Sequence, residues 1–494
     1  MTEDGRALVP SQTCWRREQA DRFALIVDAA DYFRFAKAAM LEAQHSIMLI
    51  GWDFDTRIKF EPQSPTMHGP NRLGRFLIWL PKRRPGLQIY LLKWDLGMVQ
   101  ALGRGMTPLF VLDLITTARL RLKLDAAHPA GAAHHQKIVV IDDSLAFCGG
   151  IDMTVDRWDT REHRDGDRRR RKPSGRAYAP WHDATAVVDG DAALAIGDLA
   201  RERWRLATGE RIAPASSRRP AWPRDLTPIF ERVEIGIART IPEFDGNPEV
   251  REIERLYLEA FARARRTIYI ETQYLASRKL VEGLARRLGD REGPDIVIVL
   301  PESAGGWLER KAMDGARRKL LRLLWRADRH QRLGVYYPVT QSGEPIYVHA
   351  KIMIVDDWLL RVGSSNLNNR SMGFDTECDL ALEAAPDEIE GTKTRGAINS
   401  IRRDLLCEHL GVEVDVFMAA FDRSGGSLLK TIEALRRPGR TLNAFKVEDI
   451  AEDESILAEN ELLDPEGAAP SLKEQAIRGL RDLISRMRVR KQTS

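Results

Sequence analysis

The chain has 494 residues, of which 43% are apolar and 30% charged, and its formal net charge is +4 at pH 7. This length and apolar content supply two α/β units of ordinary size with full cores, which indicates a globular enzyme. The weak positive charge is compatible with an anionic phosphate substrate, but it falls far short of the excess that marks a nucleic-acid binder.

The N-terminal residues begin acidic and lack a basic stretch followed by an apolar core, so they do not resemble a secretory signal. No run of 18 apolar residues occurs in the sequence, which excludes a membrane-spanning helix. The four cysteines are too sparse for a disulfide framework, and none has the C-x2-C spacing of a zinc site. We expect a cytoplasmic protein that visits a membrane surface if its substrate is a lipid.

Helices and strands alternate along the first half. Apolar residues recur mostly at intervals of three and four over residues 22–43, which predicts an amphipathic helix that leads into a strand at 46–51. The pattern then predicts helices at 73–81 and 107–118 and strands at 87–94 and 119–124. This alternation indicates an α/β layer with a partly parallel sheet.

A polar motif with the pattern H-x-K-x4-D follows in the segment HHQKIVVID. His135 and Lys137 are two positions apart, so on an extended backbone both side chains leave the same face and can converge on one ligand. The apolar residues 138–141 predict a buried strand, and Asp142 comes directly after it.

A basic insert separates this motif from the next strand. Residues 161–176 include five consecutive basic residues and show no periodicity, which indicates a solvated loop; a clamp for anionic lipid headgroups at the rim of a site is the alternative. Residues 181–189 predict a further strand of the same sheet. The proline-rich residues 207–228 mark the linker between two halves.

The second half repeats this order and ends in a second motif. It predicts strands at 232–238, 267–272, 295–300 and 334–337 and helices at 249–265, 280–288 and 307–326. His349, Lys351 and Asp356 then lie 214 residues after His135, Lys137 and Asp142.

The same offset relates the turns that trail the two motifs. It carries Gly149 onto Gly363 and Asp152 onto Asn366 without a gap. A second in-register copy is far rarer by chance than a single match, so the duplication is the strongest signal in the chain. Two homologous sheets should pack about a pseudo-twofold axis, with both motifs at the interface.

The residue types in the motifs suit phosphoryl transfer. A neutral imidazole attacks phosphorus and an imidazolium protonates the leaving alkoxide, so two facing histidines divide the reaction between them. The two lysines and the turns GGID and GSSN are expected to hold the phosphate oxygens through ammonium, main-chain N–H and amide groups. The turn residues concerned are Gly149, Gly150, Asp152, Ser364 and Asn366. Asp152 should turn towards a donor, because a carboxylate repels a phosphate. No metal ion or other cofactor is required.

With its duplicated motif, here HHQKIVVID and VHAKIMIVD, the chain resembles the phospholipase D superfamily. Residues 180–183, PWHD, and 268–274, IYIETQY, resemble the PWHD and IYIExQY elements of the larger phospholipid-cleaving members. The resemblance spans most of residues 40–385 and implies two homologous α/β/α sandwich halves with an active site at their interface. It also implies a phosphohistidine intermediate, assigned provisionally to His135.

The resemblance implies that downstream carboxylates orient the two imidazoles, and by position these are Asp183 and Glu377. We expect each carboxylate to hold the histidine of its own half, which pairs Asp183 with His135 and Glu377 with His349.

Four further residues receive supporting roles. Asp142 and Asp356 lie seven residues after their histidines, a span of about 23 Å at about 3.3 Å per residue, so we assign them to salt bridges that support the motifs. Gln273 and Tyr274 lie at a strand end that the resemblance places near the pocket.

The chain is expected to divide into residues 1–206 with the first motif, the linker 207–228, residues 229–440 with the second motif, and a C-terminal part, 441–494. The last part contains an acidic tether at 448–466 and a basic amphipathic helix at 472–490. Such a helix either covers the core of its own protein or lies on an anionic membrane.

The function implied by the resemblance is hydrolysis or transphosphatidylation of glycerophospholipids by a monomer, with water or a primary alcohol as acceptor. A cardiolipin-synthase-type phosphatidyltransferase is one alternative, although such enzymes usually carry N-terminal membrane segments. A nuclease of the same superfamily is another, but we expect no nucleic acid partner, because the small nucleases carry one motif per chain.

Overall fold

The computed structural model describes residues 6–95, 118–216, 221–305, 307–385, 389–446 and 464. The helix expected at 107–118, the acidic tether at 448–466 and the C-terminal helix at 472–490 lie outside these residues, except for Ala118 and Asp464. Within the described part, no helix combines the length and the apolar character that crossing a bilayer requires.

The first half of the chain forms eight strands and three helices within the described residues. Its elements are β1 (Arg16–Val27), α1 (Ala29–Glu42), β2 (Ser46–Gly51), α2 (Leu73–Arg83), β3 (Gln88–Trp94), β4 (Leu120–Asp125), β5 (Ile138–Ile141), β6 (Leu145–Gly149), β7 (Trp181–His182), β8 (Ala184–Asp189) and α5 (Gly190–Thr208).

The second half repeats this order and adds helices after its last motif strand. Its elements are β9 (Phe230–Ile241), β10 (Val250–Arg251), α6 (Glu252–Arg263), β11 (Thr267–Glu271), α7 (Arg278–Gly289), β12 (Asp295–Val299), α8 (Trp307–Ala327), β13 (Leu333–Val339), β14 (Tyr347–Val348), β15 (Ile352–Val355), β16 (Leu359–Gly363), the π-helix η1 (Arg370–Phe374), β17 (Glu377–Glu383), α9 (Ile389–Leu410), α10 (Val414–Arg423), α11 (Leu428–Leu435) and β18 (Thr441–Ala444).

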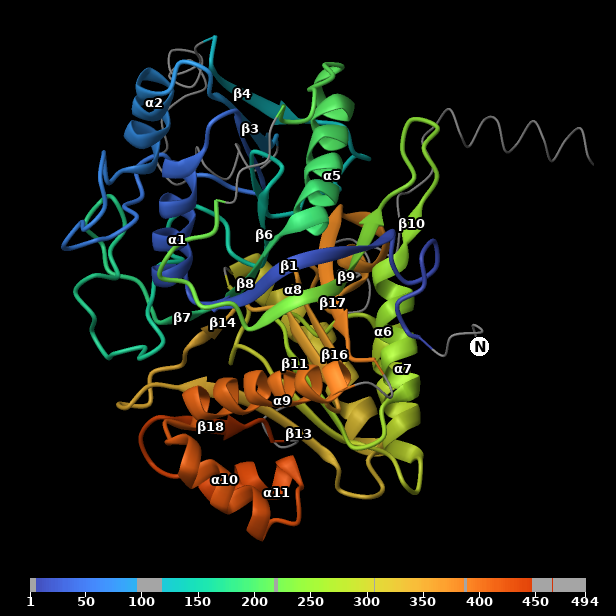
Figure 1. The fold of residues 1–494 in the computed structure, drawn as a ribbon. Coiled ribbons are helices and arrows are strands. Elements are labelled where there is room, and N and C mark those ends of the chain that lie inside the picture. Colours follow the sequence, from blue (N-terminus) through green and yellow to red (C-terminus); the bar gives the residue numbers. More distant parts are fainter. Residues whose placement is uncertain are drawn as a thin grey trace, which may run out of the picture.

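One large sheet contains both halves in mirrored order. From one edge its strands run β4-β3-β2-β5-β6-β8-β1, and from the other, after β18, they run β13-β12-β11-β15-β16-β17-β9. The two series meet where β1 and β9 pair antiparallel, side by side across the middle of the molecule (Figure 1). This arrangement is the expected α/β fold of two homologous halves, joined by a continuous hydrogen-bonded sheet.

The parallel and antiparallel strands have separate places in each half. Strands β2, β3 and β4 are parallel, as are β11, β12 and β13, whereas the motif strands β5 and β15 pair antiparallel with β2 and β11. The partly parallel sheet is therefore confirmed. The carboxyl ends of the parallel strands lie at the same sheet edge as the segments that lead into the motif strands.

Helices cover both faces of the sheet, so each half has three layers. Alternate residues of β2 enter different cores: Ile47 packs with residues of α1 and α2, whereas Met48 packs with residues of α5. In the second half, Ile296 of β12 packs with residues of α6 and α7, and Val297 with residues of α9 and α11. The core that contains Met48 and Val297 is one cluster shared by both halves, which fixes the halves against each other.

The helix predicted at residues 22–43 is wrong over its first part. Residues 16–27 form β1, and Asp28, with φ of 66°, separates this strand from α1. Because β1 is a central strand, Phe23 faces one core and Ala24 the opposite core, so its apolar residues are consecutive rather than alternating. A strand buried on both faces is difficult to distinguish from a helix by periodicity.

Candidate active site

The segments that carry the motif histidines lie just before β5 and β15 and pair with the opposite half. The N–H of His135 donates to the carbonyl of Thr376 at 3.0 Å, and the N–H of His349 donates to the carbonyl of His182 at 2.8 Å. Each acceptor immediately precedes a carboxylate residue, Glu377 at the start of β17 and Asp183 just before β8. These two equivalent bonds bring both motifs to the interface between the halves.

Each motif histidine is hydrogen-bonded to a carboxylate of the opposite half. The Nδ1–H of His135 donates to both oxygens of Glu377, at 2.9 and 3.0 Å, and that of His349 donates to Asp183 at 2.7 Å. The expected pairs, Asp183 with His135 and Glu377 with His349, are therefore wrong, although the two carboxylates do hold the two imidazoles. The exchange follows from the main-chain pairing, because each carboxylate comes directly after the carbonyl that accepts the histidine N–H.

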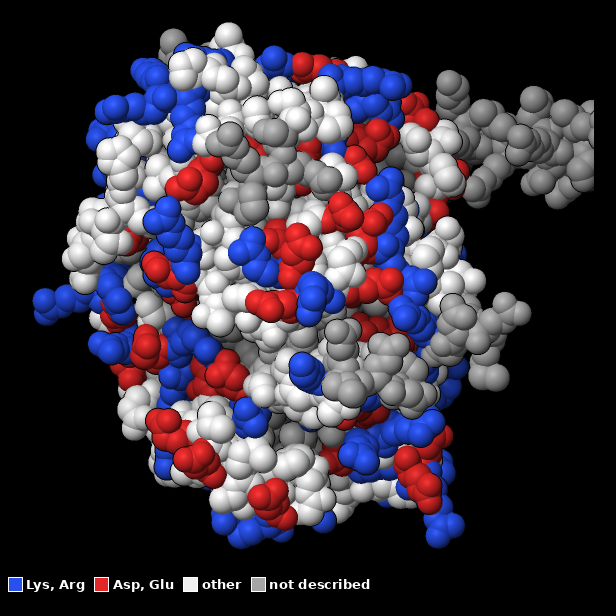
Figure 2. Space-filling model, in the orientation of Figure 1, with Lys and Arg blue, Asp and Glu red and all other residues white. Residues whose placement is uncertain are grey.

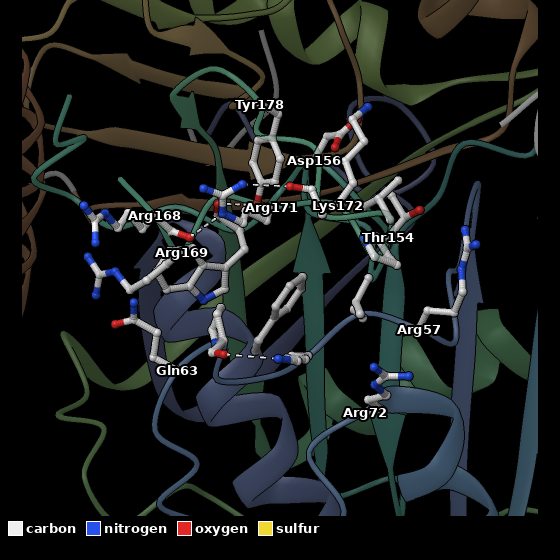
Figure 3. Close-up of a pocket in the computed structure, with 18 residues that line it drawn as sticks. Arg57, Gln63, Arg72, Thr154, Asp156, Arg168, Arg169, Arg171, Lys172 and Tyr178 are labelled. Carbon is white, nitrogen blue, oxygen red and sulfur yellow. Dashed lines mark hydrogen bonds and ion pairs between the residues drawn. The ribbon is translucent and has the colours of Figure 1, made fainter. Parts of the chain in front are cut away.

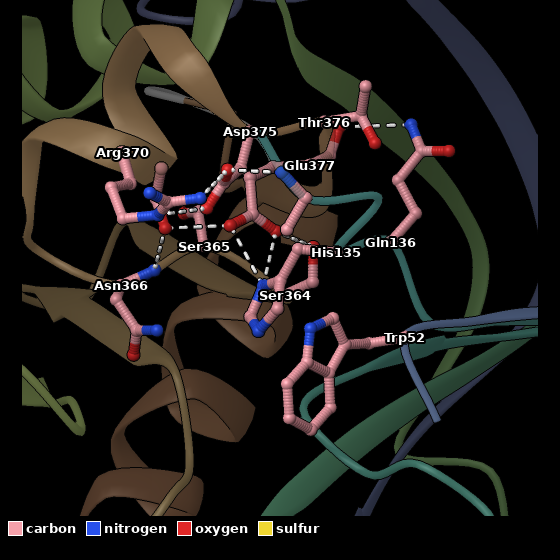
Figure 4. A network of polar contacts seen from close by, with 12 residues as sticks. Trp52, His135, Gln136, Ser364, Ser365, Asn366, Arg370, Asp375, Thr376 and Glu377 are labelled. Atoms are coloured by element: carbon pink, nitrogen blue, oxygen red, sulfur yellow. Dashed lines mark hydrogen bonds and ion pairs between the residues drawn. The ribbon is translucent and has the colours of Figure 1, made fainter. Parts of the chain in front are cut away.

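Glu377 is fully buried in a network of hydroxyl and imidazole donors. Its oxygens accept hydrogen bonds from His135 and from the hydroxyls of Ser364 and Ser371 (Figure 4). Burial raises the pKa of Glu377 to about 7, and the charge of Lys137 and the two hydroxyls offset only part of that effect. This carboxyl group therefore titrates near neutral pH.

Asp183 accepts a main-chain hydrogen bond, and a neighbouring glycine leaves space for its carboxylate. It accepts the N–H of Ala184 at 2.8 Å, and its own N–H donates to Asp28 at 3.1 Å. Burial raises its pKa, and the nearby charge of Lys351 opposes that rise. A Cβ atom at Gly150 would lie 2.2 Å from Asp183 Oδ1, so a larger residue would displace the carboxylate.

The pKa of both motif histidines lies well below the usual value. For each ring burial is the largest cause, and nearby ammonium groups add to it: first Lys137 for His135, and first Lys351 for His349. Both rings are therefore neutral in the free protein. Since Nδ1 of each ring donates to a carboxylate, Nε2 carries the free lone pair that a nucleophile or a base requires.

The two motif lysines lie in equivalent positions. Lys137 Nζ donates to the carbonyl of His135 at 2.9 Å, and Lys351 Nζ donates to the carbonyl of His349. Each ammonium group thus lies beside its own catalytic candidate. Burial lowers the pKa of Lys351 to about 7, and the Asp183 carboxylate opposes this effect.

Asp152 and Asn366, which differ between the copies, also differ in their contacts. Asp152 Oδ2 lies 3.3 Å from Lys137 Nζ, and Oδ1 accepts the N–H of Trp52 at 3.2 Å, so this carboxylate is turned towards donors as expected. Asn366 donates its main-chain N–H to Ser371 Oγ at 3.0 Å, whereas its side-chain Oδ1 is buried without a hydrogen-bond partner among the described residues. The second copy therefore retains hydrogen-bonding capacity for a ligand.

The N–H groups of the turns are not available for phosphate oxygens. Those of Gly149, Gly150 and Ser364 donate to main-chain carbonyls at 3.4, 2.8 and 3.1 Å, so their expected role as phosphate donors is wrong. The glycines serve packing instead, since a Cβ atom at Gly149 would lie 2.4 Å from Thr185 Cα. The side chain of Ser364 keeps a role through its bond to Glu377.

The motif aspartates bind main-chain N–H groups instead of forming the expected salt bridges. Asp142 accepts the three consecutive N–H groups of residues 44–46, each at 2.7 Å, and Asp356 accepts those of residues 265–267 at 2.7–2.9 Å. Both aspartates have φ of 50°, in the left-handed region. Each carboxylate thus ties the turn after the motif strand to the start of the neighbouring strand, β2 or β11.

Gln273 and Tyr274 belong to a polar and aromatic wall beside the second motif. The Gln273 amide donates to the hydroxyls of Tyr274 at 2.8 Å and Tyr347 at 3.0 Å. The Trp181 ring stacks on Tyr347, with centroids 4.6 Å apart, and lies 5.1 Å from the His349 ring. The sequence analysis did not include Trp181 or Tyr347 in the site.

Trp52 is a further site residue that the sequence analysis missed. Its ring lies 6.4 Å from His135 and stacks on Trp94 at 5.9 Å (Figure 4 shows Trp52 beside His135). Both tryptophans follow or end parallel strands, β2 and β3, at the carboxyl edge where ligands bind in α/β sheets. Applied to the strand ends predicted from the sequence, the rule that ligands bind at this edge would have identified Trp52 and Trp94 as site residues.

A basic pocket of about 300 Å³ lies beyond the GGID turn (Figure 3). Its cations come from the basic insert and from the segment after β2, and its lining includes neither motif histidine. The basic lining residues are Arg57, Lys59, Arg72, Arg168, Arg169, Arg171 and Lys172. The insert is thus held by contacts of its own, such as the ion pair between Lys172 and Asp156 at 2.5 Å, rather than wholly solvated.

Known proteins are similar in sequence to most of this chain. The family model described as Phospholipase D matches residues 327–434. Phospholipase D A of Dictyostelium discoideum is 25% identical over 462 residues, which cover 78% of this chain and 35% of that protein. Phospholipase D alpha 1 of Cynara cardunculus is 24% identical over 523 residues, which cover 77% of this chain and 64% of the relative. The chain therefore spans less than two thirds of the length of these relatives.

A solved structure shares the fold. The phosphatidylserine synthase of Haemophilus influenzae Rd KW20 aligns with a TM-score of 0.53 at 13% identity, over 87% of this chain and 100% of that chain. The duplicated motif, the mirrored halves and the homologues across the chain agree with one another. On this evidence the chain is similar to the phospholipase D superfamily over most of its length.

Proposed function

We propose that the chain is a phospholipase D, a phosphodiesterase that hydrolyses or transphosphatidylates glycerophospholipids through a phosphohistidine. The observation that carries the proposal is the pair of neutral imidazoles, each held at Nδ1 by a buried carboxylate of the opposite half. Such rings present two Nε2 atoms to one substrate, and the two buried lysines supply positive charge for its phosphate.

In the first step, Nε2 of His135 attacks phosphorus and forms an N–P bond. The bond between phosphorus and the headgroup oxygen breaks, and Nε2 of His349 gives a proton to that oxygen. The phosphodiester charge favours the imidazolium form of His349 in the complex, which burial disfavours in the free protein. Asp183 stabilises that imidazolium through Nδ1.

In the second step, the neutral His349 takes a proton from water or a primary alcohol. The oxygen of that acceptor attacks phosphorus, and the N–P bond to His135 breaks. Water gives phosphatidate, and an alcohol gives a phosphatidyl alcohol. Glu377 holds the His135 ring through both steps, because its bond to Nδ1 does not involve the reacting nitrogen.

The basic pocket supports contact with an anionic lipid surface. Lys59, Arg72, Arg168 and Arg171 line it and have no carboxylate within 4 Å among the described residues. Unpaired cations on one face attract anionic headgroups at about 1 kcal/mol each. We therefore propose a cytoplasmic monomer, with halves at 1–206 and 229–440, that docks transiently on membranes through the basic insert.

Two other functions are weaker candidates. A phosphatidyltransferase of the cardiolipin synthase type would use the same histidines with phosphatidylglycerol as acceptor. A nuclease needs a basic track for a phosphate backbone, whereas basic and acidic side chains are interspersed over the face shown in Figure 2.

The test is to incubate the purified protein with mixed glycerophospholipids, with and without ethanol, and to analyse the products by mass spectrometry. We expect phosphatidate in water and phosphatidylethanol with ethanol. Cardiolipin as the main product with phosphatidylglycerol would favour the synthase. Cleavage of DNA without any lipid product would refute the proposal.

A further inference from the structure

A second cluster of histidines and carboxylates lies beside the active site, at the junction of the two halves. It consists of Asp28 before α1, His163 in the basic insert, His182 in β7 and Glu408 in α9. The side chain of each is at most 4% exposed. None of the four belongs to either motif, and the proposed reaction uses none of them.

The four residues each offer one donor atom, and these atoms all lie within 4.8 Å of one another, close enough to share one metal ion. Glu408 Oε1 lies 3.3 Å from His163 Nε2 and 3.1 Å from His182 Nδ1. Asp28 Oδ2 lies 3.5 Å from His163 Nε2, and Asp28 Oδ1 lies 3.6 Å from His182 Nδ1. Donors that bind Zn²⁺ at about 2.0–2.1 Å stand about 3.3–3.4 Å apart at the corners of a tetrahedron.

Two of these atoms lack a hydrogen bond although they are close to polar neighbours. Asp28 Oδ2 and His182 Nδ1 are buried and have no hydrogen-bond partner among the described residues. His182 Nδ1 lies 3.1 Å from Glu408 Oε1, within hydrogen-bonding distance. The angle between the two groups, rather than their distance, therefore prevents a hydrogen bond. The other two donor atoms, His163 Nε2 and Glu408 Oε1, form a hydrogen bond at 3.3 Å, so two of the four donors lack a partner and are available to a ligand.

An outer carboxylate holds the other nitrogen of each histidine. His163 Nδ1 lies 3.0 Å from Asp159, and His182 Nε2 lies 2.8 Å from Glu271. Metal-binding histidines almost always donate their remaining ring N–H in this way, which fixes the tautomer and aims the free nitrogen at the metal. Both histidines of the cluster have this support.

The charges in the cluster require additional positive charge. Asp159 pairs with Arg170 and Glu408 with Arg161, but within the described part of the chain Asp28 and Glu271 have no lysine or arginine within 4 Å. One divalent cation or two imidazolium protons would neutralise them.

We propose that Asp28, His163, His182 and Glu408 bind one structural divalent metal ion, with zinc as the best fit. A set of two imidazole nitrogens and two carboxylate oxygens suits Zn²⁺. Since the protein fills all four positions, the ion has no open position for substrate. It would bind the two halves together and hold Asp28, whose Oδ1 accepts the N–H of the catalytic candidate Asp183.

The first experiment measures metal in the wild-type chain, purified without an affinity tag from zinc-supplemented cells and dialysed. We expect about one zinc per chain by mass spectrometry, and the intense visible absorption of four-coordinate Co²⁺ after exchange. Fewer than about 0.1 metal ions per chain, together with no rise in melting temperature when Zn²⁺ is added, would overturn the proposal. The cluster would then be a network of imidazolium and carboxylate groups.

A variant tests the ligand set. Glu408→Gln should reduce zinc occupancy roughly tenfold, whereas Glu413→Gln, at an exposed position five residues further on, should leave it unchanged. Full zinc occupancy in Glu408→Gln would refute the assignment. If that variant does not fold, the Co²⁺ spectrum of the wild type decides. The proposal does not rest on the proposed function, because metal content is measured without turnover.

Discussion

The two motif sites share one framework but differ in the groups that surround the imidazoles. In each, the histidine N–H pairs with the opposite half, the lysine donates to the carbonyl of its own histidine, and the aspartate anchors a neighbouring strand. The difference begins at the residue after the glycine that both copies share, which is Gly150 in one copy and Ser364 in the other. Gly150 leaves space for Asp183, whereas the Ser364 hydroxyl binds Glu377.

This comparison shows how a symmetric framework supports two different chemical roles. Glu377, which binds His135, also accepts hydrogen bonds from two hydroxyl groups. Asp183, which binds His349, accepts one from a main-chain N–H instead. The His135 side chain is 15% exposed and that of His349 only 6%. The position of each ring is set by the framework, and its proton affinity by the neighbours that differ.

The largest expected effect comes from removing either histidine. His135→Ala and His349→Ala should each lower turnover by more than about a thousandfold, because a nucleophile and an acid that act together are both indispensable. The exposed His330→Ala is the control. Retention of more than about a tenth of the activity, a loss of only ~1.4 kcal/mol, would contradict the paired mechanism. Trapping the phosphoryl group on His349 would reverse the roles.

The exchange of carboxylates is tested by Glu377→Gln and Asp183→Asn. Each should lower kcat by roughly a hundredfold to ten-thousandfold, because the imidazolium loses its counter-charge. By proton NMR, the downfield Nδ1–H resonance of His135 should be lost in Glu377→Gln and kept in Asp183→Asn. The opposite pattern would mean that each carboxylate serves the histidine of its own half.

The pH dependence sharpens the difference between the two carboxylates. Since burial raises the pKa of Glu377 to about 7, kcat/KM on a soluble phosphodiester should fall about tenfold per pH unit below that value. Above it, the ionised carboxylate stabilises the His135 imidazole. In Glu377→Gln this limb of the profile should be absent, and its persistence would assign the titration to another group.

Exchanging the residues that differ between the turns should have a smaller effect. If the Asn366 amide faces the phosphate as proposed, Asn366→Asp should raise KM about tenfold, because it places an unpaired carboxylate beside that anion. Asp152→Asn should change KM by only a few-fold, since that side chain is turned towards Lys137 and Trp52. Equal effects of the two substitutions on KM would show that both side chains face the phosphate.

The ionisation of Glu377 also affects stability. In the folded chain the pKa of Glu377 lies above its unfolded value of 4.5, so its contribution to stability is lost as the pH rises towards 7. This loss amounts to about 3 kcal/mol at about 1.4 kcal/mol per pKa unit. Glu377→Gln cannot ionise, so its melting temperature relative to the wild type should rise between pH 5 and pH 8. If the difference in melting temperature between Glu377→Gln and the wild type is the same at pH 5 and pH 8, the pKa of Glu377 is not raised in the folded protein.

Much of the fold was predictable, because each copy of the repeat is a short motif whose residues lie close together in the sequence. The offset between His135 and His349 predicted two equivalent halves, and the apolar runs after them predicted β5 and β15. The carboxylate pairing was not predictable, since it depends on which main chain lies opposite each histidine. The ligands of the proposed metal site are spread from Asp28 to Glu408, so no local spacing reveals them.

The antiparallel ladder between β1 and β9 also has an evolutionary consequence. Equivalent strands that pair antiparallel across a twofold axis form the interface of a symmetric homodimer, so the geometry is that of two identical single-motif subunits joined into one chain. In a homodimer every mutation changes both active sites at once. In the fused chain each site varies alone, which allows a glycine and a serine to occupy equivalent positions beside Asp183 and Glu377.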